Sequence, residues 1–251
     1  MITSELRHNG AELHLWLDAP KANILDAKML ASIDAALDAP ATSSVKVIVF
    51  EGRGLHFSFG ASVAEHTRAE APGMLRAFHG LFHKLARLSI PTAAIVRGNC
   101  LGGGLELAAW CSFLIAAPDA KLGQPEIKLA VFPPMASLVL PWRIGGGAAL
   151  DLCVSGRTIS GVEAHRLGLV TALAEDPSAH WDAFAAQNIL EASASSLRFA
   201  ERAARIQLNA QLATTLPALE KLYLDELMAT HDANEGIGAF LEKRKPVFTH
   251  S

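Results

Sequence analysis

The sequence predicts an α/β fold, because two kinds of pattern alternate along most of its length. Short runs of β-branched and aliphatic residues, such as 45–50 (VKVIVF), are typical of buried strands. Longer segments with apolar residues three and four positions apart, such as 74–88, are typical of helices. Strands and helices that follow one another in turn favour a sheet covered by helices.

Strands and helices alternate in the first part of the chain. Residues 11–18 exchange apolar and polar side chains with a period of two, which predicts a half-buried strand. Helical spacing follows at 26–37, and 45–50 is the next strand. The helix at 74–88 leads into a further strand at 92–96. We expect these elements to belong to one α/β domain.

The alternation continues and then gives way to helices. The next predicted elements are a helix after Gly102, a strand at 113–117, a short unit at 121–127 and a helix at 148–154. From about residue 191 the predicted elements are helices, at 196–212, at 219–230 and from about 234. We therefore divide the chain into a core of residues 1–190 and a helical region of residues 191–251. We expect the helical region to pack on the core or on a neighbouring subunit.

Composition and charge exclude several classes of protein. Hydrophobic residues make up 51% of the chain, which predicts a filled core. A net charge of −3 with mixed signs gives no indication of nucleic-acid binding. The three cysteines lack disulfide or metal-site spacing, which favours a reducing compartment. The N-terminal residues form no apolar run, and glycines and a glutamate interrupt the apolar segment 100–118. We expect a cytoplasmic protein without a signal peptide or membrane span.

Two glutamates, Glu106 and Glu126, lie in mostly apolar stretches. An unpaired carboxylate in such surroundings is costly or acquires a raised pKa. Glu106 follows the triple glycine 102–104, which opens an apolar helical run and offers backbone N–H groups to an anion. Glu126 lies in the segment 123–127 (GQPEI). Two carboxyls beside an anion site predict proton transfer around a carbonyl compound.

At these glutamates the sequence strongly resembles the crotonase (enoyl-CoA hydratase/isomerase) superfamily. The resemblance rests on five segments in the family's order and spacing: 20–23 (PKAN), 57–61 (FSFGA), 98–107 (GNCLGGGLEL), 122–127 (LGQPEI) and 240–245 (FLEKRK). It implies a spiral of ββα units and a helical C-terminal region that builds homotrimers, often paired into hexamers.

The resemblance also implies chemistry on an acyl-CoA thioester. Ala61 and Gly103 match the positions whose N–H groups form the family's oxyanion hole, which stabilises an enolate. Glu106 and Glu126 match the two acid/base glutamates of the hydratases, and members with one glutamate tend to be isomerases or other enzymes. Keeping both favours hydration. CoA is part of the substrate, so the resemblance implies no separate cofactor and no metal.

Other family positions are predicted to bind CoA or the acyl group. Lys21 and Ala22 match the loop that contacts CoA, and Phe240 and Lys243 match C-terminal CoA contacts. Ala64 stands where the family has a lysine for the CoA phosphate, so that contact is missing at this position.

Departures from the family pattern indicate a particular acyl group. Straight-chain hydratases usually have Ala-Gly-Ala-Asp in the first loop, where this chain has Phe59, Gly60, Ala61 and Ser62, and 133–137 (PPMAS) replaces the usual PGAGG. Phe132 and Pro134 therefore predict a more apolar pocket with a stiffened loop. These segments resemble a subgroup, the cyclohexa-1,5-diene-1-carbonyl-CoA hydratases, which form 6-hydroxycyclohex-1-ene-1-carbonyl-CoA in anaerobic benzoyl-CoA degradation.

Alternative functions remain open from the sequence. One is a general enoyl-CoA hydratase or isomerase, and another is a non-catalytic acyl-CoA-binding protein. His79 and His83 have the i, i+4 spacing of metal ligands, but without an evident third ligand a solvated or packed helix face is favoured. His56 and His66 flank the first loop, where a structural role is favoured over contact with substrate.

Overall fold

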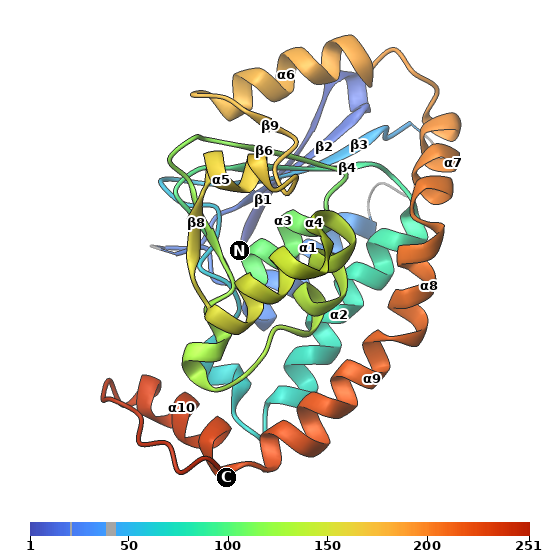
Figure 1. The fold of residues 1–251 in the computed structure, drawn as a ribbon. Coiled ribbons are helices and arrows are strands. Elements are labelled where there is room, and N and C mark those ends of the chain that lie inside the picture. The colour runs from blue at the N-terminus through green and yellow to red at the C-terminus, as the bar shows by residue number, and fades with distance from the viewer. Residues whose placement is uncertain (21, 39–43) are drawn as a thin grey trace.

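The computed structural model describes residues 1–20, 22–38 and 44–251, which form a mixed α/β fold (Figure 1). The larger sheet has the strand order β1-β2-β3-β4-β6-β9. Only the pair β1–β2 is antiparallel within this sheet as described. Its strands are β1 (Ile2–Arg7), β2 (Glu12–Leu17), β3 (Val47–Gly52), β4 (Thr92–Val96), β6 (Phe113–Ala116) and β9 (Ala172–Leu173).

Helices cover both faces of the larger sheet. Figure 1 shows α6 (Pro177–Asn188) on one face and the helices α1 to α4 on the other. Val49 and Ile95 pack with Trp181 of α6, whereas Ile48 and Phe50 point into the main core. The first helices are α1 (Ala27–Asp38), α2 (Ala71–Leu88) and α3 (Gly103–Trp110). Alternate residues of β3 and β4 therefore serve two cores, which explains their continuous apolar runs.

A second, smaller sheet creates the repeated strand-strand-helix units. It consists of β5 (Asn99–Leu101), β7 (Lys121–Gly123) and β8 (Thr158–Ser160), in that order. The chain passes from β4 to β5 and then into α3. It next passes from β6 to β7 and into the 3₁₀ turn η3 (Pro125–Leu129). These two passages bring the N-terminus of α3 and the start of η3 to the same edge of the small sheet, because β5 and β7 are parallel neighbours.

Helix α4 (Pro134–Ser155) is long and apolar enough to cross a membrane by length and composition. It bends sharply at Gly145, where φ is 76° and ψ is 158°. Neither half approaches the ~20 residues that a membrane span needs. The N-terminal half is largely buried and packs against α3. We read α4 as a core helix.

The C-terminal part of the chain is helical and wraps one side of the molecule (Figure 1). Its elements are α7 (Ala194–Ala204), α8 (Ile206–Thr214), α9 (Leu216–Lys221), the π-helical turn η4 (Leu222–Glu226), η5 (Leu227–Ala229) and α10 (His231–Leu241). Helices α8 and α9 pack on α4, and α10 packs near η2 (Val63–His66) and η3. The assembly of this region into trimers stays a prediction.

Several sequence-based expectations need correction. The helices expected at 196–212 and 219–230 are each interrupted. The first breaks at Arg205, whose Nη2 donates a hydrogen bond to the Trp110 carbonyl at 2.6 Å.

The strand expected at 11–18 is buried on both faces. Glu12 and His14 on its polar face form a network under α6, where the Trp181 Nε1–H donates to Glu12 at 3.0 Å. The sequence patterns did not predict the following elements: β1, β5, β8, β9, α6 and α5 (Gly161–Arg166).

Candidate active site

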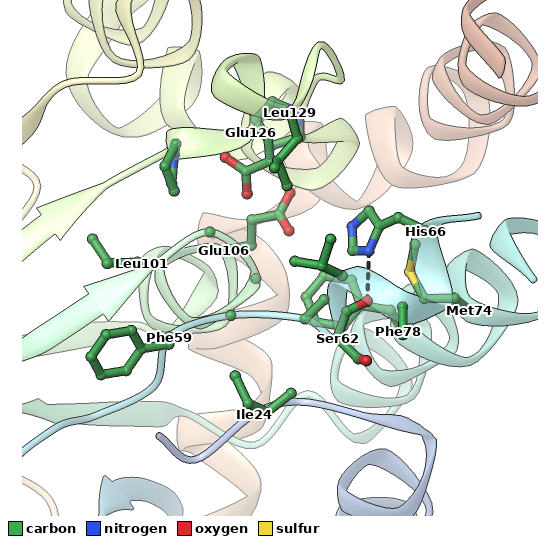
Figure 2. A pocket seen from close by; sticks show the side chains of 18 of the residues that line it. Ile24, Phe59, Ser62, His66, Met74, Phe78, Leu101, Glu106, Glu126 and Leu129 are labelled. Carbon is green, nitrogen blue, oxygen red and sulfur yellow. Dashed lines mark hydrogen bonds between the residues drawn. The ribbon is translucent and has the colours of Figure 1, made fainter. Parts of the chain in front are cut away.

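A cavity of about 670 Å³ lies at the edge where α3 and η3 meet. Its walls come from the loop that contains Ala61, from α2, from the start of α4, and from η4 and α10. Figure 2 shows Glu106 and Glu126 projecting into it from two different elements. Most of the lining is apolar, with Phe78 and Leu75 of α2 on one wall. The cavity therefore suits a mostly apolar ligand with reactive polar groups at one end.

Glu106 is held by the N-terminus of another helix. Its side chain lies on the first turn of α3 and the residue is 5% exposed. Its Oε1 accepts the N–H of Ala136 at 2.8 Å, and the N–H of Met135 also contributes. Burial raises the pKa of Glu106 to about 7, while these two N–H donors oppose the rise. The positive end of α4 thus favours the ionised form of this carboxyl.

Glu126 lies in the first turn of the short 3₁₀ helix η3. Its carboxyl lies beside that of Glu106 (Figure 2). Burial and the charge of Glu106 raise the pKa of Glu126 well above its usual range. With its amide nitrogen oriented inward, the fully buried Gln124 donates to both carboxyl oxygens, each at 3.1 Å. Two like charges this close do not both ionise at neutral pH, so the pair holds a proton.

Three glycines, two of them in the triple glycine, allow close approaches that a side chain would block. A Cβ on Gly102 would lie 2.7 Å from the Glu126 Oε1. A Cβ on Gly103 would lie 3.1 Å from the backbone nitrogen of Ala61. Gly60, with φ of +99°, leaves room for the carbonyl of Leu101 and the nitrogen of Gly103. Glycine at these positions brings the Ala61 loop, α3 and η3 together around one point.

The N–H groups of Ala61 and Gly103 form a candidate oxyanion hole. Gly103 is the first residue of α3, so its N–H has no acceptor within the helix. The Ala61 loop is fixed on both sides, because Leu25 N–H donates to the Gly60 carbonyl at 2.9 Å and Gly60 N–H donates to the Ser58 Oγ at 3.0 Å. Two rigidly held backbone donors at a helix N-terminus suit an oxygen that gains negative charge.

The structure brings most of the sequence-predicted residues to this cavity. Beside both glutamates, Ala61 and Gly103, the lining includes Ala22, Phe59, Gly60, Phe132, Pro134 and Phe240. Lys243 does not line it, and Lys21 lies outside the described residues. The roles of these residues in binding stay predictions.

Pro134 occupies a different setting from the expected loop. It is the first residue of α4. At that position a missing N–H costs the helix nothing, and the fixed φ of proline favours helix formation. The helix it begins is the one that donates to Glu106. The segment that departs from the family pattern is therefore a helix start.

The two histidines near the first loop have structural bonds. His56 Nδ1 accepts the N–H of Asn99 at 3.1 Å. His66 Nδ1 donates to the Ser62 carbonyl at 2.8 Å, as Figure 2 shows. Burial lowers the pKa of His66, so its imidazole is neutral at pH 7. His66 also lines the cavity.

Three groups of the site escaped the sequence reasoning. Gln124 was visible only as part of the motif around Glu126, without a role. The backbone N–H of Ala136 has no side-chain signature, because any residue except proline supplies it. Tyr223 comes from the helical C-terminal region and lines the cavity.

Among the described residues, no group of three or more His, Cys, Asp or Glu side chains is arranged to hold a metal ion.

Known proteins resemble this chain along almost its whole length. Residues 9–251 match the family model described as enoyl-CoA hydratase/isomerase. The cyclohexa-1,5-dienecarbonyl-CoA hydratase of Thauera aromatica is 50% identical over 243 residues, which cover 95% of this chain and 93% of that protein. A probable enoyl-CoA hydratase of Bacillus subtilis is 38% identical and covers 93% of both chains.

Solved structures agree in fold. A crystal structure of a putative enoyl-CoA hydratase from Mycobacterium avium paratuberculosis has a TM-score of 0.88 at 24% identity, with 98% of both chains covered. An enoyl-CoA hydratase subunit from Geobacillus kaustophilus is 32% identical with a TM-score of 0.72, and covers 100% of this chain and 98% of that one. The chain belongs to the enoyl-CoA hydratase/isomerase family.

Proposed function

We propose that the protein is a hydro-lyase that adds water to cyclohexa-1,5-diene-1-carbonyl-CoA and forms 6-hydroxycyclohex-1-ene-1-carbonyl-CoA. The observation that carries the reaction type is the pair of unequal carboxyls, Glu106 and Glu126, beside a candidate oxyanion hole. The 50% identity to the Thauera aromatica hydratase supports this acyl group. The apolar cavity wall is compatible with a six-membered ring.

The two glutamates divide the work of a base and an acid. Glu106 has two N–H donors from α4 that stabilise its ionised form, so we assign the carboxylate to Glu106. Glu126 has the higher pKa and holds the proton of the pair. In the proposed reaction Glu106 accepts a proton from the attacking water, and Glu126 gives its proton to carbon. Exchange of a proton between the adjacent carboxyls then restores the starting state.

The thioester oxygen receives the charge that develops when water adds. The new C–O bond forms at the β carbon, and the displaced electron pair moves through the conjugated system to the thioester carbonyl. The N–H groups of Ala61 and Gly103 would hold that oxygen. One such preorganised donor contributes roughly 2.7–4 kcal/mol to transition-state stabilisation.

The cyclic dienoyl substrate separates the two reacting carbons. Water adds at the β carbon, and the proton arrives at the far end of the dienolate, across the ring. The acid must therefore lie beyond the position that serves an ordinary α carbon. Glu126 has its own support, Gln124, and lies on a separate element. The separate element and the separate support favour a distinct role for Glu126 as the acid that protonates carbon.

A comparison of substrates tests the proposal. We expect the purified protein to hydrate cyclohexa-1,5-diene-1-carbonyl-CoA with a kcat/KM at least about 100-fold above that for crotonyl-CoA, a difference of about 2.7 kcal/mol. Far faster hydration of crotonyl-CoA would instead establish a general enoyl-CoA hydratase, which the 38% identity to the Bacillus subtilis protein favours as the second candidate. Tight acyl-CoA binding without any turnover would establish a binding protein.

A further inference from the structure

Tyr223 carries a hydroxyl to which the proposed chemistry assigns no role. It is the single tyrosine of the chain, is 1% exposed and lines the cavity. Its ring packs edge-on against Phe132, with the ring centroids 5.4 Å apart. It lies on the π-helical turn η4, and such turns occur frequently at functional sites. The side chain is therefore fixed in place by packing beside the reacting groups.

The hydroxyl has no hydrogen-bond partner in the part of the chain that the structure describes. A buried, unpaired hydroxyl destabilises a fold, so phenylalanine at this position would serve packing better than tyrosine. Burial and the charges of Glu126 and then Glu106 raise the pKa of Tyr223. The hydroxyl thus remains a neutral donor near both carboxyls, and the described residues supply no acceptor for it.

We propose that Tyr223 donates a hydrogen bond to the oxygen of the water that adds to the acyl-CoA, and later to the product hydroxyl. This inference rests on the proposed hydration. A water molecule has two O–H bonds and two lone pairs. The Glu106 carboxylate and the unprotonated oxygen of the Glu126 carboxyl accept its two O–H bonds, and one lone pair attacks the β carbon. The second lone pair is left for a donor, which Tyr223 provides.

Tyr223 keeps its proton throughout. The proton lost by water goes to Glu106, and the proton gained by carbon comes from Glu126. The phenol orients the attacking oxygen in hydration, and in the reverse direction it stabilises the leaving oxygen, which takes its proton back from Glu106 and departs as water. The same bond therefore accelerates both directions, as a catalyst must.

The substitution Tyr223→Phe tests this role, because it removes one oxygen atom and keeps the ring. We expect kcat for hydration to fall about 10- to 100-fold, in line with the loss of one hydrogen bond to a reacting group. The melting temperature should stay the same or rise. The dissociation constant for a saturated acyl-CoA, measured by calorimetry, should change less than about 2-fold, because that ligand brings no water or hydroxyl to the site.

A second variant, Tyr223→Leu, and the wild-type rate serve as controls. Tyr223→Leu removes the ring as well, and separates packing against Phe132 from the hydroxyl. If only Tyr223→Leu impairs hydration, the hydroxyl has no role and the inference is wrong. Equal losses of kcat and of saturated-ligand affinity in Tyr223→Phe would also contradict it, because they indicate a role in pocket shape. The wild-type rate in the same assay reports separately on the proposed function.

Discussion

The substitution Gly103→Ala probes the candidate oxyanion hole with a single methyl group. The added Cβ would lie 3.1 Å from the Ala61 nitrogen and 3.2 Å from Cζ of Phe78. The phenyl ring can shift by a few tenths of an ångström, whereas the Ala61 loop is anchored through Gly60 to Leu25 and Ser58. The methyl group would therefore intrude between the two N–H donors while the helix itself tolerates alanine.

We expect Gly103→Ala to fold and to lose activity. Loss of one oxyanion donor lowers kcat by about 10²- to 10³-fold, or roughly 2.7–4 kcal/mol. Steady-state hydration kinetics measure this loss, and thermal unfolding should show a melting temperature within a few degrees of wild type. Retention of kcat within about 3-fold would refute the assignment of Gly103 to the oxyanion hole.

The second triple glycine of the chain supplies a matched control. Gly147 lies in α4, and a Cβ built there meets nothing within 4 Å. Gly147→Ala should leave hydration kinetics unchanged and stabilise the fold by up to about 1 kcal/mol, because alanine favours a helix over glycine. The same methyl group thus has opposite consequences in the two glycine runs.

Three further predictions concern the acid/base pair and the CoA moiety. Glu106→Gln and Glu126→Gln should each lower kcat by at least about 10³-fold without unfolding the protein, as measured by hydration kinetics and circular dichroism; activity within 10-fold of wild type in either variant would contradict its role. The profile of kcat/KM against pH should be bell-shaped. Activity should fall below a pH of about 7 as Glu106 gains a proton, and should fall at higher pH as Glu126 loses one; a profile flat from pH 5 to 10 would contradict the pair. Lys128 is the only lysine or arginine among the described residues that lines the cavity, so Lys128→Ala should raise KM for acyl-CoA about 3- to 10-fold with kcat unchanged, and an unchanged KM would place the CoA phosphates elsewhere.

The sequence was sufficient for the elements whose pattern is local. The strand at 92–96 appears with the expected bounds, and the helix expected at 74–88 begins three residues earlier. Glu106 and Glu126 were identifiable because a carboxyl in an apolar stretch requires an explanation. The small sheet then brings them together through the parallel pairing of β5 and β7.

The remaining features depend on contacts between distant segments. The support of Glu106 comes from a backbone N–H 30 positions away in sequence, which no residue type reveals. The polar face of β2 is buried because α6 covers it, and Trp181 and His14 provide partners for Glu12. Tyr223 reaches the cavity only through the path of the C-terminal helices. Tertiary packing decides each of these, so periodicity and motifs do not contain them.

The division of labour between the two glutamates, at two separate carbons, is the central claim. Hydration of cyclohexa-1,5-diene-1-carbonyl-CoA in water labelled with ²H and ¹⁸O, followed by mass spectrometry and NMR of the product, tests it directly. We expect ¹⁸O at the β carbon and deuterium at the far end of the former diene, across the ring. Deuterium at the α carbon, next to the thioester, would contradict it.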